Sequence, residues 1–282
     1  MSHLPHHIAL VSDTSNVSFS DITAVAAALQ KQATRDFGPI WNIDGTVNGF
    51  DTLEAVPVDY WPVIIMDNIN EPGAAGYHTD NNGQPFSLVQ ADDTWPLTAS
   101  HETLEMLADP FGSRTIAGSA PPQAPAPISN LRRVTYLVEV CDPCEDKQFA
   151  YTVNGQLLSD FITPHYYDPN GTTGVLCSFR GQVKSPHTVL ENGYVSFGNP
   201  VTNEWHQIVV MNGKTQVRHL GVLNRNGRSI RETIDMQVRE ARKNDRYRTA
   251  RPLAAKAAHA SAAMSESSTA RAKSLRGFIE TL

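Results

Sequence analysis

The stretch TASHETLEMLADPFG (residues 98–112) decides how this chain is interpreted, because it predicts one helix with a defined start and end. Pro96 lies near the entry, and Thr98 or Ser100 can cap the first turn. Asp109-Pro110 and Gly112 are typical of a helix end. We therefore expect a single helix between these signals.

Three side chains of this helix can act on a metal ion. Glu105 follows His101 by four residues, so the two side chains lie one turn apart and can share one Zn²⁺ at ~2.0–2.2 Å. Glu102 lies one position round the helix, where it can remove a proton from water that the metal activates. His101 also lies on the apolar stripe of the helix, which predicts that it faces the packed side; the other members are Leu97, Leu104 and Ala108. An ordinary helix with an i,i+4 His/Glu pair has the same spacing, and this alternative stays open.

A catalytic zinc ion usually takes three protein ligands, so another part of the chain must supply the third. The segment VEVCDPCED (138–146) ends a predicted strand, and loops held by rigid elements often complete such sites. Its acids are the first candidates: Glu139, Asp142 and Glu145. Asp109 lies about 12 Å from His101 along an unbroken helix, which disfavours it. His78 and His165 are further candidates.

Upstream of the helix, short apolar runs and one amphipathic segment predict a sheet with a backing helix. Strands are expected at His7–Val11, at PIWNIDG (39–45) and at YWPVIIMDNI (60–69). A helix capped by Ser20 is expected to stop near Gly38. The pair Asn82-Gly83 predicts a hairpin or an edge strand. This order predicts an α+β fold, with helices packed on one mixed sheet.

The rest of the chain is expected to be β-rich and then helical. The Pro/Ala-rich stretch 117–130 predicts a loop or lid, RRVTYLVEV predicts a strand, and short β runs continue to about residue 222. A helix is expected from about Ile230, followed by an Ala/Ser-rich segment that is helical or disordered and ends in LRGFIETL. The predicted regions are 1–116 (α+β), 117–230 (β-rich, with an acidic CxxC loop) and 231–282 (basic tail).

The charge of the chain is unevenly distributed. From Arg239 onward there are ten Lys/Arg and four Asp/Glu, whereas the preceding 238 residues carry 13 basic and 25 acidic side chains. The tail is therefore +6 and the body −12, which sum to the net charge of −6. Such a tail is either a solvated helical segment or the attachment point for an acidic partner.

Composition limits the class of protein. The 282 residues suffice for one large domain or two modest ones, and 40% hydrophobic residues exclude a disordered chain. No apolar run approaches the ~18–20 residues of a membrane span. The first residues show no secretory signal, so we expect a cytoplasmic protein or one exported by a non-standard route. Cys141, Cys144 and Cys177 are too few for a disulfide framework, which leaves a local disulfide or quiet thiols.

With these motifs, residues 7–110 resemble the zincin metallopeptidase superfamily, which combines a sheet, a backing helix, a substrate-aligning edge strand and an active-site helix beginning His-Glu. The resemblance implies His101 and Glu105 as zinc ligands and Glu102 as general base. It also implies that the 73–80 edge, with Tyr77 and His78, pairs with a peptide substrate. The chain departs from HExxH at Glu105, whose negative charge weakens water activation. Blocks over about residues 90–180, such as YLVEVCDPCE, are also similar to a group of mostly bacterial proteins.

Two functions follow from these observations. The first is a zinc-dependent hydrolase, with a peptide or protein as substrate. The second is a non-catalytic binding or assembly protein on a zincin-like scaffold, in which the carboxylates form a polar network or hold a structural ion such as Ca²⁺ and the tail docks a partner. The chain has no GxSxG, P-loop or dinucleotide motif, which disfavours a nucleophilic hydrolase or a nucleotide-binding enzyme.

Overall fold

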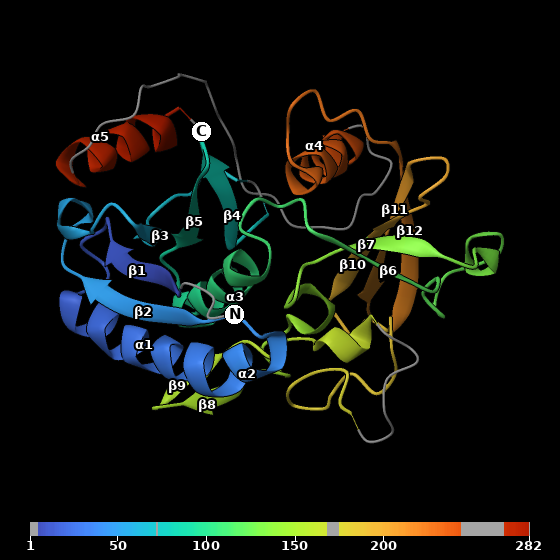
Figure 1. The fold of residues 1–282 in the computed structure, drawn as a ribbon, viewed down its shortest axis with the longest axis horizontal. Coiled ribbons are helices and arrows are strands. Elements are labelled where there is room, and N and C mark those ends of the chain that lie inside the picture. The colour runs from blue at the N-terminus through green and yellow to red at the C-terminus, as the bar shows by residue number, and fades with distance from the viewer. Residues whose placement is uncertain (1–4, 72, 168–174, 244–267, 282) are drawn as a thin grey trace. The chain divides into compact units, whose positions relative to one another are not determined.

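The computed structural model describes residues 5–71, 73–167, 175–243 and 268–281, and it confirms an α+β fold. The chain divides into two compact units, which are treated separately below (Figure 1). The first unit holds the described residues up to Pro110, the segment Thr152–Leu158 and the C-terminal helix. The second unit holds Phe111–Tyr151 and the described residues from Ser159 to Lys243. The division therefore falls at residue 110, where 116 was expected, and the predicted tail region is shared between the two units.

The first unit is built on a five-stranded mixed sheet in the order β2-β1-β3-β5-β4. Four strands are parallel, and β4 joins the edge antiparallel to β5 through the expected Asn82-Gly83 turn. The strands are β1 (His6–Ser12), β2 (Gly45–Phe50), β3 (Tyr60–Met66), β4 (Gly76–Asn81) and β5 (Gln84–Gln90). The predicted mixed sheet, hairpin and edge strand are confirmed.

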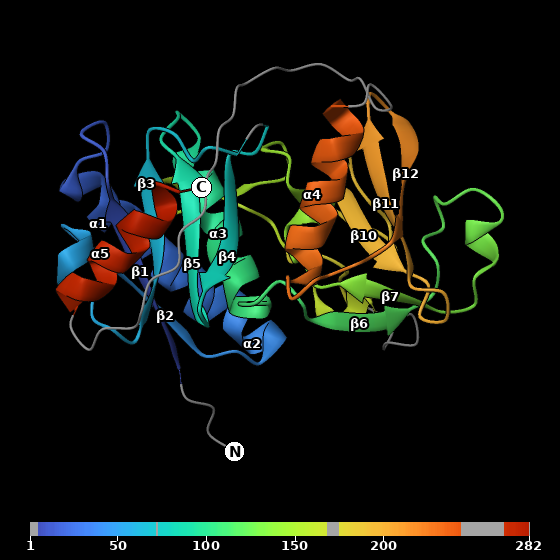
Figure 2. The same cartoon turned by 90° about the horizontal axis from the view of Figure 1, so that it is seen from above.

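Helices cover both faces of this sheet (Figure 2). On one face, Gly49 of β2 approaches Ile22 of α1 (Phe19–Lys31), and Ser87 of β5 contacts Met106 of α3 (Trp95–Ala108). On the other face, the C-terminal helix α5 (Ser268–Ile279) packs on alternate residues of the strands. This core includes the strand residues Ala9, Val11, Ile64, Phe86 and Leu88 and the helix residues Ala272, Leu275 and Ile279. A strand buried on both faces has no polar alternation, which explains the continuous IALV run of β1.

Two arginines fix α5 to the first unit. The buried Arg271 guanidinium donates hydrogen bonds to four main-chain carbonyls in the segment after the short 3₁₀ helix η2 (Leu53–Ala55), those of Val56, Pro57, Val58 and Tyr60. Arg276 forms ion pairs with Asp13 and Glu54. Two of the ten cations of the basic tail therefore serve its own fold. The apolar side chains of this helix, Leu275, Phe278 and Ile279, pack on the sheet of the first unit.

The local prediction for residues 32–45 is wrong. The chain leaves α1 through a π-helical segment η1 (Gln32–Phe37) and a short helix α2 (Gly38–Trp41), so PIWN is helical and the next strand starts at Gly45. Buried Ala33, Phe37 and Trp41 continue the apolar stripe of the helix at intervals of four residues. Asn42 ends it in the left-handed conformation (φ 53°).

The expected helix caps are also wrong by a few residues. Ser18 caps α1 and forms a reciprocal capping box with Asp21, where Ser20 was predicted. Thr94 is the cap residue of α3, where Thr98 or Ser100 was predicted, because Pro96 occupies the second helical position. The end of α3 at Asp109 is as expected.

The second unit contains a five-stranded antiparallel sheet in the order β12-β11-β10-β7-β6. Its strands are β6 (Thr115–Gly118), β7 (Val134–Leu137), β10 (Tyr194–Gly198), β11 (Glu204–Met211) and β12 (Lys214–Val222). Helix α4 (Ile230–Lys243) packs on one face through Ile230 and Ile234. On the other face, the buried His187 ring stacks on Tyr136 at 5.0 Å, and its Nε2 lies 3.2 Å from the carbonyl of Tyr167. The predicted β-rich region and the helix expected from about Ile230 are confirmed.

The Pro/Ala-rich stretch is more regular than expected. Its first residues belong to β6, and Ile128–Asn130 forms a 3₁₀ turn, η3. A two-stranded hairpin, β8 (Tyr151–Val153) and β9 (Gln156–Leu158), returns the chain to the first unit, where β9 packs on α3. The three cysteines are buried free thiols. Among the described residues, no helix combines the length and apolar character that a membrane crossing requires.

Candidate functional site

Helix α3 is almost entirely enclosed by the first unit. It packs on β4 and β5 of the sheet and on the β9 hairpin strand. A buried hydrogen bond of 2.8 Å from Ser100 Oγ to Gln32 Oε1 ties it to η1. Because neighbours surround the helix, its two glutamates are buried as well: Glu102 is 2% exposed and Glu105 is 0% exposed. Buried carboxylates require hydrogen bonds, counter-charges or a cation, so the two glutamates need polar or cationic partners inside the protein.

Helix α3 brings the side chains of His101 and Glu105 together, as their spacing predicts. His101 Nε2 lies 3.2 Å from Glu105 Oε1, and the side chain of His101 is only 12% exposed. Two ligand atoms of one tetrahedral zinc, each bound at about 2.0 Å, lie about 3.3 Å apart. The pair therefore already has the separation that a shared zinc ion needs. A hydrogen bond from the imidazole to the carboxylate has a similar length, so the distance alone fits both states.

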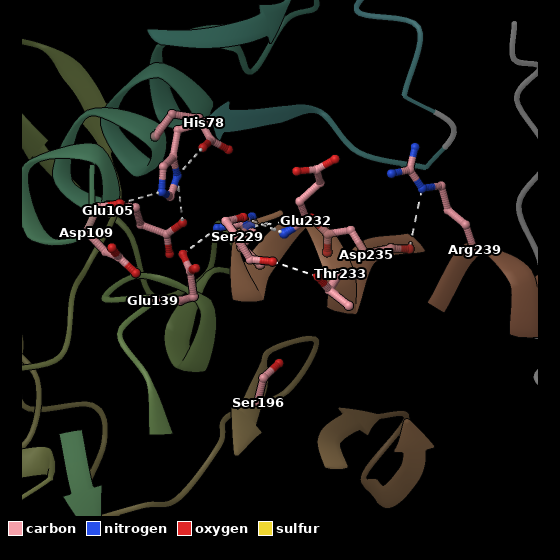
Figure 3. Close-up of polar contacts among 12 residues, drawn as sticks. His78, Glu105, Asp109, Glu139, Ser196, Ser229, Glu232, Thr233, Asp235 and Arg239 are labelled. Carbon is pink, nitrogen blue, oxygen red and sulfur yellow. Dashed lines mark hydrogen bonds and ion pairs between the residues drawn. The ribbon is translucent and has the colours of Figure 1, made fainter. Parts of the chain in front are cut away.

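A second histidine reaches the same glutamates from the edge strand. His78 of β4 has a fully buried side chain, and its Nδ1 lies 3.5 Å from Glu102 Oε2. The same nitrogen lies 3.8 Å from Glu105 Oε2 (Figure 3). Its other nitrogen, Nε2, lies 3.0 Å from the main-chain oxygen of Asp109 at the end of α3. Figure 3 shows the ring between these contacts. The edge-strand histidine is thus part of the buried cluster.

Two polar atoms of this cluster have no hydrogen-bond partner in the part of the chain that the structure describes. They are His78 Nδ1 and Glu102 Oε2, and both are inaccessible to solvent. Leaving such groups unsatisfied costs about 1–3 kcal/mol each. The cluster therefore offers oxygen and nitrogen donors that suit Zn²⁺, and the residues fit a divalent cation.

The close approach of β4 to α3 depends on Gly76. A Cβ atom built on Gly76 would lie 2.6 Å from Thr98 Cγ2 and 3.0 Å from both Cγ and Oε1 of Glu102. Carbon atoms in ordinary contact lie about 3.5–4.0 Å apart. The absence of a side chain at this position is what lets the edge strand lie against the glutamate.

The register of β4 determines which main-chain groups face outward. The Gln90 N–H donates a hydrogen bond to the Ala75 carbonyl at 2.7 Å, so these two residues form a hydrogen-bonded pair of the antiparallel ladder. Hydrogen-bonded and non-hydrogen-bonded pairs alternate along such a ladder, so His78, opposite Ser87, belongs to a non-hydrogen-bonded pair. The N–H and C=O of His78 therefore point away from β5, and β4 is the edge strand of this sheet among the residues that the structure describes. Tyr77 is different, because its main chain faces β5 and its side chain packs with the core under α5. Of the two predicted edge residues, only His78 presents its main chain to an added strand.

The predicted third ligands all belong to the second unit. Glu139 follows β7, Asp142 lies in the 3₁₀ helix η4 (Asp142–Cys144), and Glu145 ends that turn. The buried carboxylate of Glu139 accepts a hydrogen bond from Arg231 of α4, so an ion pair within the second unit already engages it. The other candidate, His165, lies in the 3₁₀ helix η5 (Pro164–Tyr166) of the second unit. The choice among these residues stays a prediction.

Sequence reasoning missed two features of the site. The first is that the side chain of His78 faces α3. The sequence does not show which face of β4 packs on this helix, because that depends on the pairing of β4 with β5. The alternation of β4 does signal that Tyr77 and His78 face opposite ways. The second is Arg231, whose counter-ion is 92 residues distant in sequence. Its motif, Ser229 capping the N–H of Glu232, signals the helix start but not the ion pair.

Comparisons with models of protein families, with curated proteins and with solved structures give no match to this chain. The function is therefore argued from the residues of the site.

Proposed function

We propose that this protein is a zinc-dependent hydrolase that cleaves peptide bonds, with the site on α3. The observation that carries the proposal is the His101–Glu105 pair, which is held 3.2 Å apart on a buried helix beside the edge strand of a mixed sheet. The two side chains would hold the ion. A bound zinc ion supplies a Lewis acid that lowers the pKa of water toward neutrality.

The other residues of the site have separate roles in this proposal. Glu102 is one position round the helix from His101 and accepts the proton of the attacking water. The outward main chain of His78 pairs with an extended substrate, as in β-strand addition. Burial of Glu102 excludes bulk water from this step and strengthens its electrostatic interactions. The position of β4 at the edge of the sheet, antiparallel to β5, supports its role in aligning a substrate.

The proposal is tested by metal content and peptide hydrolysis on the full chain. Glu102→Gln should keep stoichiometric zinc but lose about 10²–10⁴-fold in turnover, because it removes a general base and no ligand. Glu105→Ala should lose the zinc. The exposed Glu240 of α4 provides the matched control, and Glu240→Gln should change neither. Wild-type protein that holds no stoichiometric zinc would refute the proposal.

The second candidate is a non-catalytic protein with a structural ion. It is favoured by the enclosure of the cluster, in which the side chains of His78 and Glu105 are fully buried and that of Glu102 is 3% exposed. An extra carboxylate in place of a second helix histidine also suits a hard cation such as Ca²⁺. In that case the metal should raise the melting temperature, and Glu102→Gln should lower metal affinity without any turnover to lose.

A further inference from the structure

Two histidines lie opposite each other on neighbouring strands of the second unit. His206 of β11 is the register partner of His219 on β12. The Val210 N–H donates to the Gly193 carbonyl, and the Val210 carbonyl accepts from the Asn192 N–H, so the main chain of Val210 faces away from β12. Because this direction alternates along a strand, the main chain of His206 faces away from β12 as well. The two histidines therefore form a non-hydrogen-bonded pair, the kind in which opposite side chains approach most closely.

The separation of the two rings suits a shared metal ion. Their centroids lie 5.1 Å apart, and their planes are at 86° to each other. An imidazole nitrogen binds a tetrahedral Zn²⁺ at about 2.0–2.1 Å, and two rings bound in this way have centroids about 5 Å apart. An edge-to-face contact between rings has a similar separation. The hydrogen bonding of the rings therefore decides between the two interpretations.

His206 lacks a hydrogen-bond partner at one nitrogen. Its Nδ1 is inaccessible to solvent, and no residue within the described part of the chain forms a hydrogen bond with it. The neighbouring ring on β10 is that of Phe197, at 5.7 Å between centroids, and a phenyl ring has no oxygen or nitrogen to offer. A buried polar atom without a partner destabilises the fold. Ring packing alone leaves this nitrogen unsatisfied, whereas a bound cation can satisfy it.

The surroundings of His206 favour the form of imidazole that binds metals. Only a neutral imidazole is a ligand. Burial lowers the pKa of His206, the neighbouring His219 lowers it further, and Glu204 opposes these effects. His219 is exposed, so an ion can enter from solvent and the His219 side chain can turn toward it. The pair therefore combines one shielded ligand with one accessible ligand.

We infer that His206 and His219 bind a transition-metal ion of the borderline class, with water completing its coordination. Imidazole suits Cu²⁺, Ni²⁺ and Zn²⁺, and Cu²⁺ has the highest affinity of this series. Strands β11 and β12 hold the two ligands in a fixed register, so binding does not have to order the main chain. The site lies entirely in the second unit and goes beyond the proposed function, which concerns α3 in the first.

The test follows the ring C–H signals of histidines by nuclear magnetic resonance while Cu²⁺ is added to the full chain. This paramagnetic ion broadens the signals of nearby rings, and those of His206 and His219 should broaden together. In His219→Gln, the His206 signal should require at least about 10-fold more Cu²⁺, because even the loss of an outer-shell partner costs roughly 10–100-fold in affinity. His165→Gln is the matched control, since it removes another histidine of the second unit, and it should leave the His206 response unchanged.

Replacement of the exposed His219 should leave the melting temperature without metal unchanged, and Cu²⁺ should raise the melting temperature of wild type more than that of His219→Gln. Broadening of the two rings at clearly different Cu²⁺ concentrations would overturn the inference. So would a His206 response that His219→Gln leaves unchanged. His219→Gln should also keep the zinc content and the peptide turnover of wild type, so this inference and the proposed function fail separately.

Discussion

Replacing Gly76 with alanine tests the close packing of the edge strand on helix α3. The new Cβ would lie 2.6 Å from Thr98 Cγ2 and 3.0 Å from Glu102 Oε1, where about 3.5–4.0 Å is ordinary. Overpacking of this kind costs about 1–3 kcal/mol, and the lower entropy of the unfolded alanine chain offsets about 0.4–1 kcal/mol. We expect a net loss of about 1–2 kcal/mol in the free energy of unfolding.

The assay is urea denaturation of Gly76→Ala, Thr98→Ala and the double variant. Thr98→Ala removes the methyl group at 2.6 Å, so the Gly76 substitution should cost at least about 0.5 kcal/mol less in that background. Gly277 of α5 is the matched control, because a Cβ there meets nothing within 4 Å, and Gly277→Ala should stabilise the protein by about 0.5–1 kcal/mol. If Gly76→Ala gains stability as Gly277→Ala does, β4 and α3 are not packed as described.

Three further outcomes are expected. Arg271→Lys should lower the free energy of unfolding by about 2 kcal/mol or more, because one ammonium group cannot donate to four carbonyls. An unchanged free energy of unfolding in urea titration would contradict the role of these hydrogen bonds. Burial lowers the pKa of His187, so its contribution to the free energy of unfolding should be present above about pH 6.5 and decline as the pH falls. His187→Asn should show a smaller decline of this free energy with pH, and asparagine tolerates the left-handed backbone at this position (φ 60°). Thiol reagent should find Cys141, Cys144 and Cys177 unreactive in native protein but all three reactive in denaturant; fewer than three would indicate a disulfide.

Local patterns in the sequence predicted most elements of both units. The Asn82-Gly83 turn gave the hairpin, and the signals at Asp109-Pro110 gave the end of α3, because each depends on a few adjacent residues. The exit from α1 was wrong, since Gly38-Pro39 was taken as the end of the helix, whereas buried Phe37 and Trp41 continue it. Here tertiary packing of an apolar stripe prevailed over the local signal.

Long-range pairings could not be predicted from the sequence. The His101–Glu105 spacing follows from helix geometry and was predictable, whereas the place of His78 depends on which strand lies next to α3. The hydrogen bonds of Arg271 to carbonyls 211 to 215 residues away have no local signature in the sequence. For the same reason, the predicted third region was a tail, although its last helix is part of the core of the first unit.

The position of α5 has a consequence for how the polypeptide is made. The strands β1 to β5 leave the ribosome early, but the residues that cover their second face, 268–279, follow more than 170 residues later. During that interval Val11, Ile64 and Phe86 lack their covering helix. The nascent first unit therefore exposes an apolar surface of the kind that chaperones bind. The second unit contains its own sheet and helix within the intervening stretch and can mature before the first. The first unit, although its strands are synthesised first, can therefore be completed only after the whole second unit has been made.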